Sequence, residues 1–393
     1  MPGTRPQTTA VAPSAEDKTV QDDRGDAVAT QHASVRAIAG PTLVALAFFA
    51  GVALLAGSTD GFRFCELVHI GPRVQPSLLV PCEREAGPGY DGQFYFAIAH
   101  DPFLTRPETA TSLDDSLRYR RILYPLTAWL LSAGQPAALP YALVLINVVA
   151  ATTLVALAAA TAVRAGRSAW WALLLAIFGG VWLPITRDLT EPLQLALLAA
   201  GMTAGSATLV LLAGFAKETA GVALTTETAR GLLRRQRGVA VRFGAGALVL
   251  VAWVIFVRAA VHGSADRTLE GQFLRPPGAP LFVLADSLPN EPARFVVTAI
   301  ALAICVLAIA RIARVRDGAA VAGAAYAAVE LGAGYDNWQE PLAVFRAMAG
   351  AVVLVYLSWC AARDRIGFVA LVLAAGSGIL SAVGVFASTV AYR

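Results

Sequence analysis

Asp91 is the residue whose type and setting best fit catalytic chemistry, and it lies in the polar and aromatic segment Tyr90–Phe103. A carboxylate can act as a general base toward a hydroxyl within hydrogen-bond reach, or as a metal ligand. Tyr95, one helical turn further on, could support a sugar by stacking or hydrogen bonding. Two structural alternatives remain open: Asp91 could cap a helix after Pro88-Gly89, and Tyr95 could belong to an aromatic belt. The segment is predicted to form the floor of a functional site.

His100 and Asp101 form a second polar pair at the end of the same segment. A histidine titrates near neutral pH and can shuttle protons. The alternative is a structural helix end, at which His100 complements the helix dipole and Asp101-Pro102 stops the helix. Both residues are held in reserve as site candidates.

Three arginines, Arg118, Arg120 and Arg121, directly precede the uncharged segment Ile122–Val163. Guanidinium groups bind phosphate in a bidentate manner, so an arginine cluster beside an apolar helix suits the phosphate of a lipid. The alternative is that Arg118 pairs with Asp114 at a spacing of four residues, while the others reach toward water.

Further ionisable residues lie within or beside apolar segments: Glu191, Lys217 with Glu218, and Arg346. Such residues are costly in a membrane and tend to face a cavity or one another. Glu191, Lys217 and Arg346 are therefore candidate substrate-binding residues. Alternatively, Glu191 before Pro192 starts a helix, Lys217 and Glu218 neutralise each other, and Arg346 is an anchor at the membrane interface.

The composition defines the class of protein. The chain is 57% hydrophobic and 15% charged, with a mean hydropathy of +0.61, whereas soluble domains carry about 25% charged residues. Uncharged runs longer than the roughly 18 residues of a bilayer span occur at Ala37–Thr59, Ile122–Val163, Pro192–Ala216 and Ile366–Tyr392. The sequence predicts an all-α, polytopic integral membrane protein. A net charge of +4 gives no reason to expect a nucleic-acid partner.

The predicted organisation is a disordered cytoplasmic tail at residues 1–35 and a single transmembrane domain at residues 36–393. The domain should contain about nine to eleven spans, depending on whether residues 193–215 form one span or a hairpin. Short basic turns should be cytoplasmic. This places the protein in the cell membrane with a cytoplasmic N-terminus. The long loop at residues 58–121, with its interfacial helices and candidate site, is then extracytoplasmic.

Two of the four cysteines, Cys65 and Cys82, fall in this loop. In an extracytoplasmic loop they could form a disulfide, and the alternative is a pair of free thiols. The chain has no Walker motif and no His/Cys zinc spacing. The cofactor requirement stays undetermined, with a divalent cation as the open candidate.

Three sequence motifs are similar to those of a known superfamily: residues 90–95 (YDGQFY), residues 98–102 (IAHDP) and residues 118–125 (RYRRILYP). Together with residues 188–193 and the turn at residues 216–219, they resemble the GT-C-type multi-span glycosyltransferases. The resemblance is strongest to prokaryotic mannosyltransferase-like proteins linked to cell-surface glycopolymers. It covers about the first two-thirds of the chain, and the later spans match only in hydropathy.

The resemblance implies a GT-C-like fold and transfer of a mannose-like sugar from a polyprenyl-phosphate donor to a glycan or lipid acceptor, within the membrane lipids. Carried over, Asp91 is the base candidate, and Arg118, Arg120 and Arg121 are candidates for the donor phosphate. Two other classes of function stay open. One is a transporter or flippase of lipid-linked sugar, and the other is a non-catalytic assembly subunit.

Overall fold

The computed structural model of this chain describes the backbone of residues 15–58, 61–261, 278–288, 291–333, 338 and 340–391. Side chains are described from residue 35 to residue 383 within these ranges, except for residues 341–342. In this part of the chain every regular element is a helix, and there is no strand. The predicted all-α class is therefore confirmed.

Five of the described helices contain a stretch long and apolar enough to cross a bilayer. They are α1 (Ala15–Gly57), α7 (Leu139–Arg164), α13 (Arg237–Ala260), α16 (Pro292–Ala310) and α21 (Arg365–Ala391). A bent pair of helical segments gives a sixth candidate span, and α11 (Ala207–Ala216), α17 (Gly318–Leu331) and α20 (Ala349–Ala362) are shorter apolar helices. The chain is thus a polytopic α-helical membrane protein. Hydropathy predicted about nine to eleven spans. That number counts the shorter apolar helices as well, although each of them is shorter than the bilayer is thick.

Residues 168–185 are uncharged, and hydropathy predicts one straight span there, but the structure has the bent pair instead. Its segments are η4 (Ala169–Ala172), α8 (Leu173–Ile177), α9 (Gly179–Trp182) and η5 (Leu183–Arg187), and its two halves meet at 71°. Phe178 has an extended backbone, with φ −61° and ψ 125°, and this ends α8. Helix α21 packs closely on the break, because a Cβ added to Gly378 would collide with the carbonyl group of Ile177.

Residues 193–215 form a helical hairpin, which was one of the two alternatives predicted for them. Helix α10 (Glu191–Ala204) is followed by Gly205 in the left-handed region, with φ +62°, and then by α11. Glycine adopts this conformation at no steric cost. Because α10 begins at Glu191 and α11 ends just before Lys217, the hairpin brings the two charged residues to the same end of the bundle.

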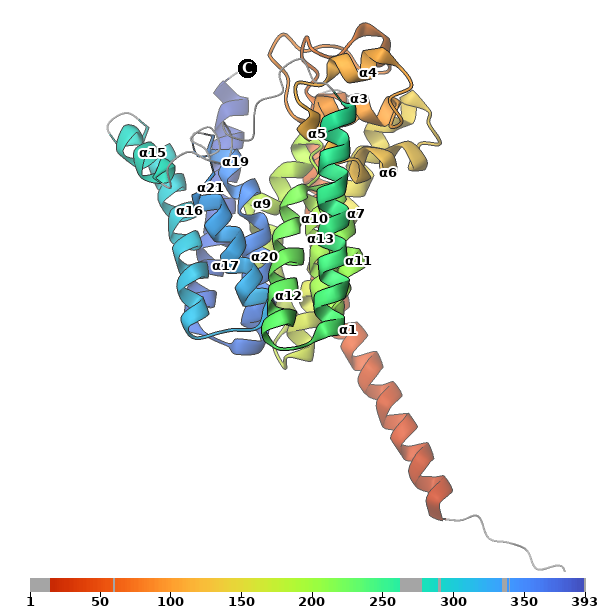
Figure 1. The fold of residues 1–393 in the computed structure, drawn as a ribbon, viewed down its shortest axis with the longest axis vertical. Helices are drawn as coiled ribbons and strands as arrows, with labels where there is room; N and C mark the ends of the chain where they lie inside the picture. The colour runs from red at the N-terminus through yellow and green to blue at the C-terminus, as the bar shows by residue number, and fades with distance from the viewer. Residues whose placement is uncertain are drawn as a thin grey trace, which may run out of the picture.

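The two ends of the helix bundle differ in character. The loop at residues 61–121 covers one end, called the loop end below (Figure 1). The short basic turns meet at the opposite end, called the turn end. There Arg363 donates to the Ala165 carbonyl oxygen at 2.8 Å, and Arg234 donates to the Arg316 carbonyl oxygen at 3.1 Å. The short turns that carry arginine thus lie at one end, while the long polar loop lies at the other.

Short helices build the loop end around one disulfide. Cys65 and Cys82 are bonded, with their Cα atoms 5.3 Å apart. Two of these helices are α3 (Gly92–His100), which begins directly after Asp91, and α6 (Leu123–Leu131), near the start of the uncharged segment Ile122–Val163. The other elements around this loop are α2 (Cys65–Val68), η2 (Pro76–Leu78), α4 (Pro107–Ser112), α5 (Ser116–Arg120) and η3 (Pro136–Ala138).

Five further elements are described in the second half of the chain. They are η6 (Glu218–Ala220), α12 (Gly221–Leu233), α15 (Ala279–Ser287), η7 (Arg311–Ala313) and α19 (Pro341–Ala347).

The N-terminal segment, predicted to be a disordered tail, is described from Ala15 onward. Helix α1 begins at Ala15, so residues 15–34 have a helical backbone that extends away from the bundle (Figure 1). Residues 1–14 of the predicted tail lie outside the described residues, as do residues 59–60 of the predicted loop.

Candidate functional site

Asp91 directly precedes α3, but its side chain makes no capping hydrogen bond. Its Oδ2 atom lies 2.9 Å from Arg118 Nη1 and 3.4 Å from Arg346 Nη2. Burial alone would raise the pKa of Asp91, yet Arg118 and Arg346 outweigh burial and hold that pKa below its usual value. The Asp91 carboxylate is therefore ionised at neutral pH, and two guanidinium groups converge on one of its oxygens.

Arg118, from α5, joins two carboxylates and an aromatic ring. Its Nε donates to Asp114 Oδ1 at 3.0 Å, which is the predicted pair four residues apart, while Nη1 contacts Asp91. The guanidinium carbon lies 4.8 Å from the centre of the Phe94 ring. Arg118 thus combines both predicted roles, as a partner of Asp114 and as a member of the site.

Arg121 forms a second buried ion pair, with Glu218. Its Nε and Nη2 atoms donate to the two Glu218 carboxylate oxygens at 3.0 and 2.8 Å, and Nη1 donates to the Tyr95 hydroxyl at 2.9 Å. The Tyr95 ring is buried edge-on against Tyr124, with ring centres 5.9 Å apart. Tyr95 is therefore held inside the site and does not lie in an aromatic belt.

Glu191 lies at the centre of the buried charges, with 1% of its side chain exposed. Its Oε1 atom accepts from Lys217 Nζ at 2.9 Å and from Arg346 Nε at 3.1 Å. The alternative that Lys217 and Glu218 neutralise each other is wrong, since Lys217 pairs with Glu191 and Glu218 pairs with Arg121. Arg346 then connects Glu191 to Asp91, so the start of α10 is linked to the start of α3.

These contacts define one set of charged side chains, called the Asp91 network below. Its cations are matched one for one by carboxylates: Arg118, Arg121, Lys217 and Arg346 against Asp91, Asp114, Glu191 and Glu218. Because the charges balance without a ligand, an anionic ligand must take guanidinium groups away from carboxylates.

Three predicted candidates lie outside the network. Arg120 turns away, since its Nη2 atom donates to the Ser116 hydroxyl at 3.1 Å. The ring nitrogens of His100 lie 3.0 and 2.9 Å from the carbonyl oxygens of Phe96 and Val80. Asp101 accepts hydrogen bonds from the backbone and side chain of Thr105, the backbone of Arg106 and the side chain of Thr109. The contacts of His100 and Asp101 are thus structural, as the alternative for that pair predicts.

Tyr90 contacts the Asp91 network, and the sequence did not single it out as a candidate. Its hydroxyl accepts from Arg346 Nη1 at 2.6 Å and donates to Glu340 Oε1 at 2.7 Å. The ring also contacts Arg187, whose guanidinium carbon lies 5.1 Å from the ring centre. Its position next to Asp91 was the signal that could have identified it.

A metal-binding role for the network has no support among the described residues. They contain no group of three or more His, Cys, Asp or Glu side chains arranged to hold a metal ion. Asp91 and Glu191 are already neutralised by arginine and lysine.

Gly92 is essential to the docking of α3, and its replacement gives the first testable prediction. A Cβ at this position would overlap the Arg187 carbonyl oxygen and lie 3.0 Å from the Val68 carbonyl oxygen. We expect Gly92→Ala to lower the free energy of unfolding by about 1–3 kcal/mol, because these backbone atoms must move. Thermal unfolding in detergent measures this loss. Gly87→Ala is the matched control, since nothing lies within 4 Å of its Cβ position. Equal stability of the two variants would contradict the prediction.

Comparison of the chain with protein-family models, with curated proteins and with solved structures found no match in any of the three. The function of the site is therefore argued from its geometry and chemistry.

Proposed function

We propose that this chain is an integral membrane glycosyltransferase. It transfers a sugar from a polyprenyl-phosphate donor to a glycan or lipid acceptor on the extracytoplasmic face of the cell membrane. The observation that carries the proposal is the Asp91 carboxylate held between Arg118 and Arg346 at the loop end. This arrangement places a proton acceptor beside groups that bind phosphate.

The transfer step uses these residues in distinct roles. The acceptor hydroxyl attacks the anomeric carbon of the sugar, and Asp91 takes the hydroxyl proton. The bond between the anomeric carbon and the phosphate oxygen breaks, and polyprenyl phosphate leaves with the electron pair. Arg118, Arg121 and Arg346 stabilise the charge that develops on the leaving phosphate.

The ion pairs of Asp91 couple donor binding to base strength. Without a ligand, Arg118 and Arg346 depress the pKa of Asp91, although burial opposes them. A donor phosphate that takes over these guanidinium groups removes the cause of the depression. The pKa of Asp91 then rises, and the carboxylate becomes a stronger base when the donor is present.

The distribution of charge supports the proposed orientation. The short turns that carry arginine lie at the turn end, as expected for cytoplasmic turns. The loop end then faces the extracytoplasmic side. The disulfide between Cys65 and Cys82 agrees with this side, because disulfides persist in oxidising compartments. The same orientation places the N-terminus in the cytoplasm.

A reconstituted transfer assay tests the proposal. The purified chain in lipid vesicles is given radiolabelled polyprenyl-phosphate hexose and a membrane fraction that supplies acceptors. We expect the label to move from the donor to the acceptor. Movement of the donor across the bilayer without transfer would identify a flippase instead. If the label is neither transferred nor moved, the proposal fails and the assembly subunit is the alternative that remains.

Two neighbouring arginines provide the matched variants for this assay. Arg118→Lys keeps the charge but loses the planar fork that contacts Asp91 and Asp114 together, so we expect a loss of transfer of about tenfold or more. Arg120→Lys changes a residue outside the Asp91 network and should retain transfer. Equal loss in both variants would contradict the assignment of Arg118.

A further inference from the structure

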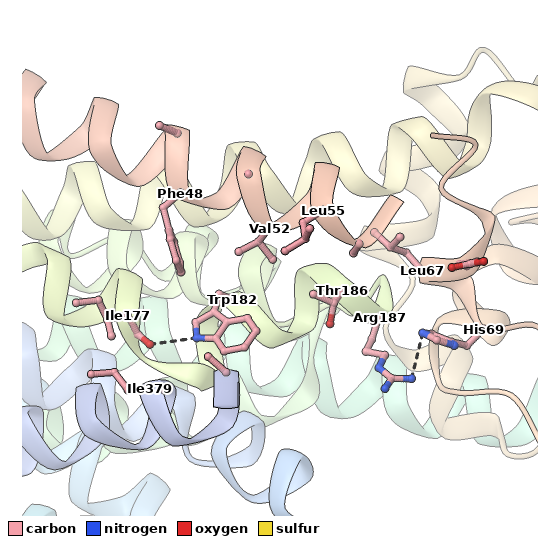
Figure 2. A pocket seen from close by; sticks show the side chains of 16 residues that line it. Phe48, Val52, Leu55, Leu67, His69, Ile177, Trp182, Thr186, Arg187 and Ile379 are labelled. Carbon is pink, nitrogen blue, oxygen red and sulfur yellow. Dashed lines mark hydrogen bonds between the residues drawn. The ribbon is translucent and has the colours of Figure 1, made fainter. Parts of the chain in front are cut away.

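A cavity of about 660 Å³ lies between α1, the bent pair and α21 (Figure 2). Most of its walls are apolar side chains, including Phe48, Val52 and Leu55 from α1, and Trp182 and Ile379 from the facing helices. Its volume is typical of pockets that hold a small molecule.

The cavity opens onto the surface that faces the lipid bilayer. Of its lining residues, Phe48 is 39% exposed, Leu55 is 55% exposed and Ile379 is 59% exposed. These residues belong to α1 and α21, which are both long enough to cross the membrane. A hydrocarbon chain can therefore enter from the bilayer without passing through water.

The end of the cavity near the loop is polar, because Arg187, His69 and Glu66 line it. Figure 2 shows Arg187 and His69 facing each other there, with Arg187 Nη1 donating to His69 Nε2 at 3.0 Å. Because arginine is only a donor, His69 Nε2 carries no proton. Burial, and then the charge of Arg187, lower the pKa of His69 to about 4. The imidazole is thus neutral near pH 7, although Glu66 also lines this end and opposes the shift.

Arg187 differs from the arginines of the Asp91 network in the kind of group that it contacts. Arg118, Arg121 and Arg346 each contact a carboxylate, whereas the ion pairs found among the described residues do not include Arg187. The direct partner of Arg187 is the neutral imidazole of His69, whose Nδ1 lies 3.2 Å from Glu85 Oε2. A guanidinium group without a directly bonded carboxylate, at the end of an apolar cavity, complements an anionic headgroup with a hydrocarbon tail.

We propose that this cavity binds the hydrocarbon chain of a lipid phosphate, with the phosphate on Arg187. Tyr90 links this position to the site, because its ring contacts both Arg187, at 5.1 Å, and Arg346, at 5.5 Å. A polyprenyl phosphate and an ordinary phospholipid share this chemistry. The inference extends the proposed function by identifying where the donor lipid is held, and lipid binding itself does not require transfer.

Photocrosslinking to the purified full-length chain tests the proposal. The probes are a polyprenyl phosphate with a photoreactive group in its chain, a matching photoreactive phosphatidic acid, and the uncharged photoreactive polyprenol. We expect the polyprenyl phosphate to label α1 and α21 next to the cavity, with at least tenfold less labelling by polyprenol. Preferential labelling by phosphatidic acid would assign the cavity to a phospholipid rather than the donor. Equal labelling by all three probes would overturn the proposed phosphate recognition.

Two variants separate the phosphate contact from the apolar cavity. Arg187→Gln should reduce labelling by polyprenyl phosphate about tenfold and leave labelling by polyprenol unchanged. Gly51→Phe should block the cavity to every probe, because Gly51 lines it and nothing lies within 4 Å of its Cβ position. Gly376→Phe is the matched control, with equally open space and no place in the cavity lining. Unchanged labelling of Gly51→Phe would overturn the proposal.

The results of this experiment remain distinct from those of the transfer assay. Labelling of the cavity in a chain that transfers no sugar leaves the lipid site standing and removes the proposed function. If the chain transfers sugar but its labelling is unaffected by Arg187→Gln and Gly51→Phe, the proposed function stands and the lipid site is removed.

Discussion

Asp91→Asn is expected to lower sugar transfer by about 10²- to 10⁴-fold, the usual contribution of a general base. Asparagine has nearly the same shape as aspartate but cannot accept the proton of the acceptor hydroxyl. The chain should still fold, because Arg118 keeps Asp114 as a partner and Arg346 keeps Glu191. The measurement is the initial rate of label transfer at saturating donor, with thermal unfolding as the check on folding.

Asp114→Asn is the matched control for this variant. It removes the other carboxylate of Arg118 by the same chemical change, and Asp114 is partly exposed. We expect it to retain transfer within about tenfold of the unmodified chain, because Asp114 only holds Arg118 in place, whereas Asp91 takes the proton of the acceptor. Full activity of Asp91→Asn, or equal losses in the two variants, would remove Asp91 from the role of base.

The sequence predicted much of the candidate site because charge in a membrane protein is constrained. Ionisable residues beside apolar segments must find partners, so Glu191, Lys217 and Arg346 could be expected to face one another. The structure joins them at 2.9 and 3.1 Å. Tyr95 and Arg121 likewise meet, although they belong to different short helices of the loop.

The choice of partner could not be predicted from neighbouring positions. Lys217 and Glu218 adjoin in the sequence, but Lys217 has an extended backbone, with φ −158° and ψ 124°. Successive side chains of extended backbone point in opposite directions. Lys217 therefore turns to α10, and Glu218 turns to α5. The extended backbone conformation of Lys217 thus determines which ion pairs form.

The break in the bent pair could not be predicted for a similar reason. Residues 168–185 contain no charged residue on either side of the break, and hydropathy does not distinguish a straight helix from a broken one. The bend lies where α21 crosses, and the close approach depends on Gly378, about 200 residues later in the chain. Residues on both sides of the bend, Ile177 and Trp182, line the cavity between α1 and α21, so the proposed lipid site was also beyond the reach of the sequence.

Glu191→Gln is expected to lower the free energy of unfolding by about 3–5 kcal/mol, because it removes the carboxylate of a buried ion pair. Lys217 and Arg346 would then face each other without the anion that neutralises both. Their repulsion should loosen the contacts between α10, the turn after α11, and α19. Chemical unfolding in detergent, followed by tryptophan fluorescence, measures this loss of stability.

Two further variants show whether the buried charge is the cause. Glu291→Gln makes the same chemical change at an exposed carboxylate, and its partner Arg294 keeps Asp286, so it should cost less than about 1 kcal/mol. Adding Lys217→Met to Glu191→Gln removes one unpaired cation and should restore part of the lost stability, because it is the unbalanced buried charge that destabilises. If Glu191→Gln were no less stable than Glu291→Gln, the Asp91 network would not be holding the helices of the loop end together. The bundle would then depend on apolar packing alone, and the network would be free to rearrange around a ligand at little cost.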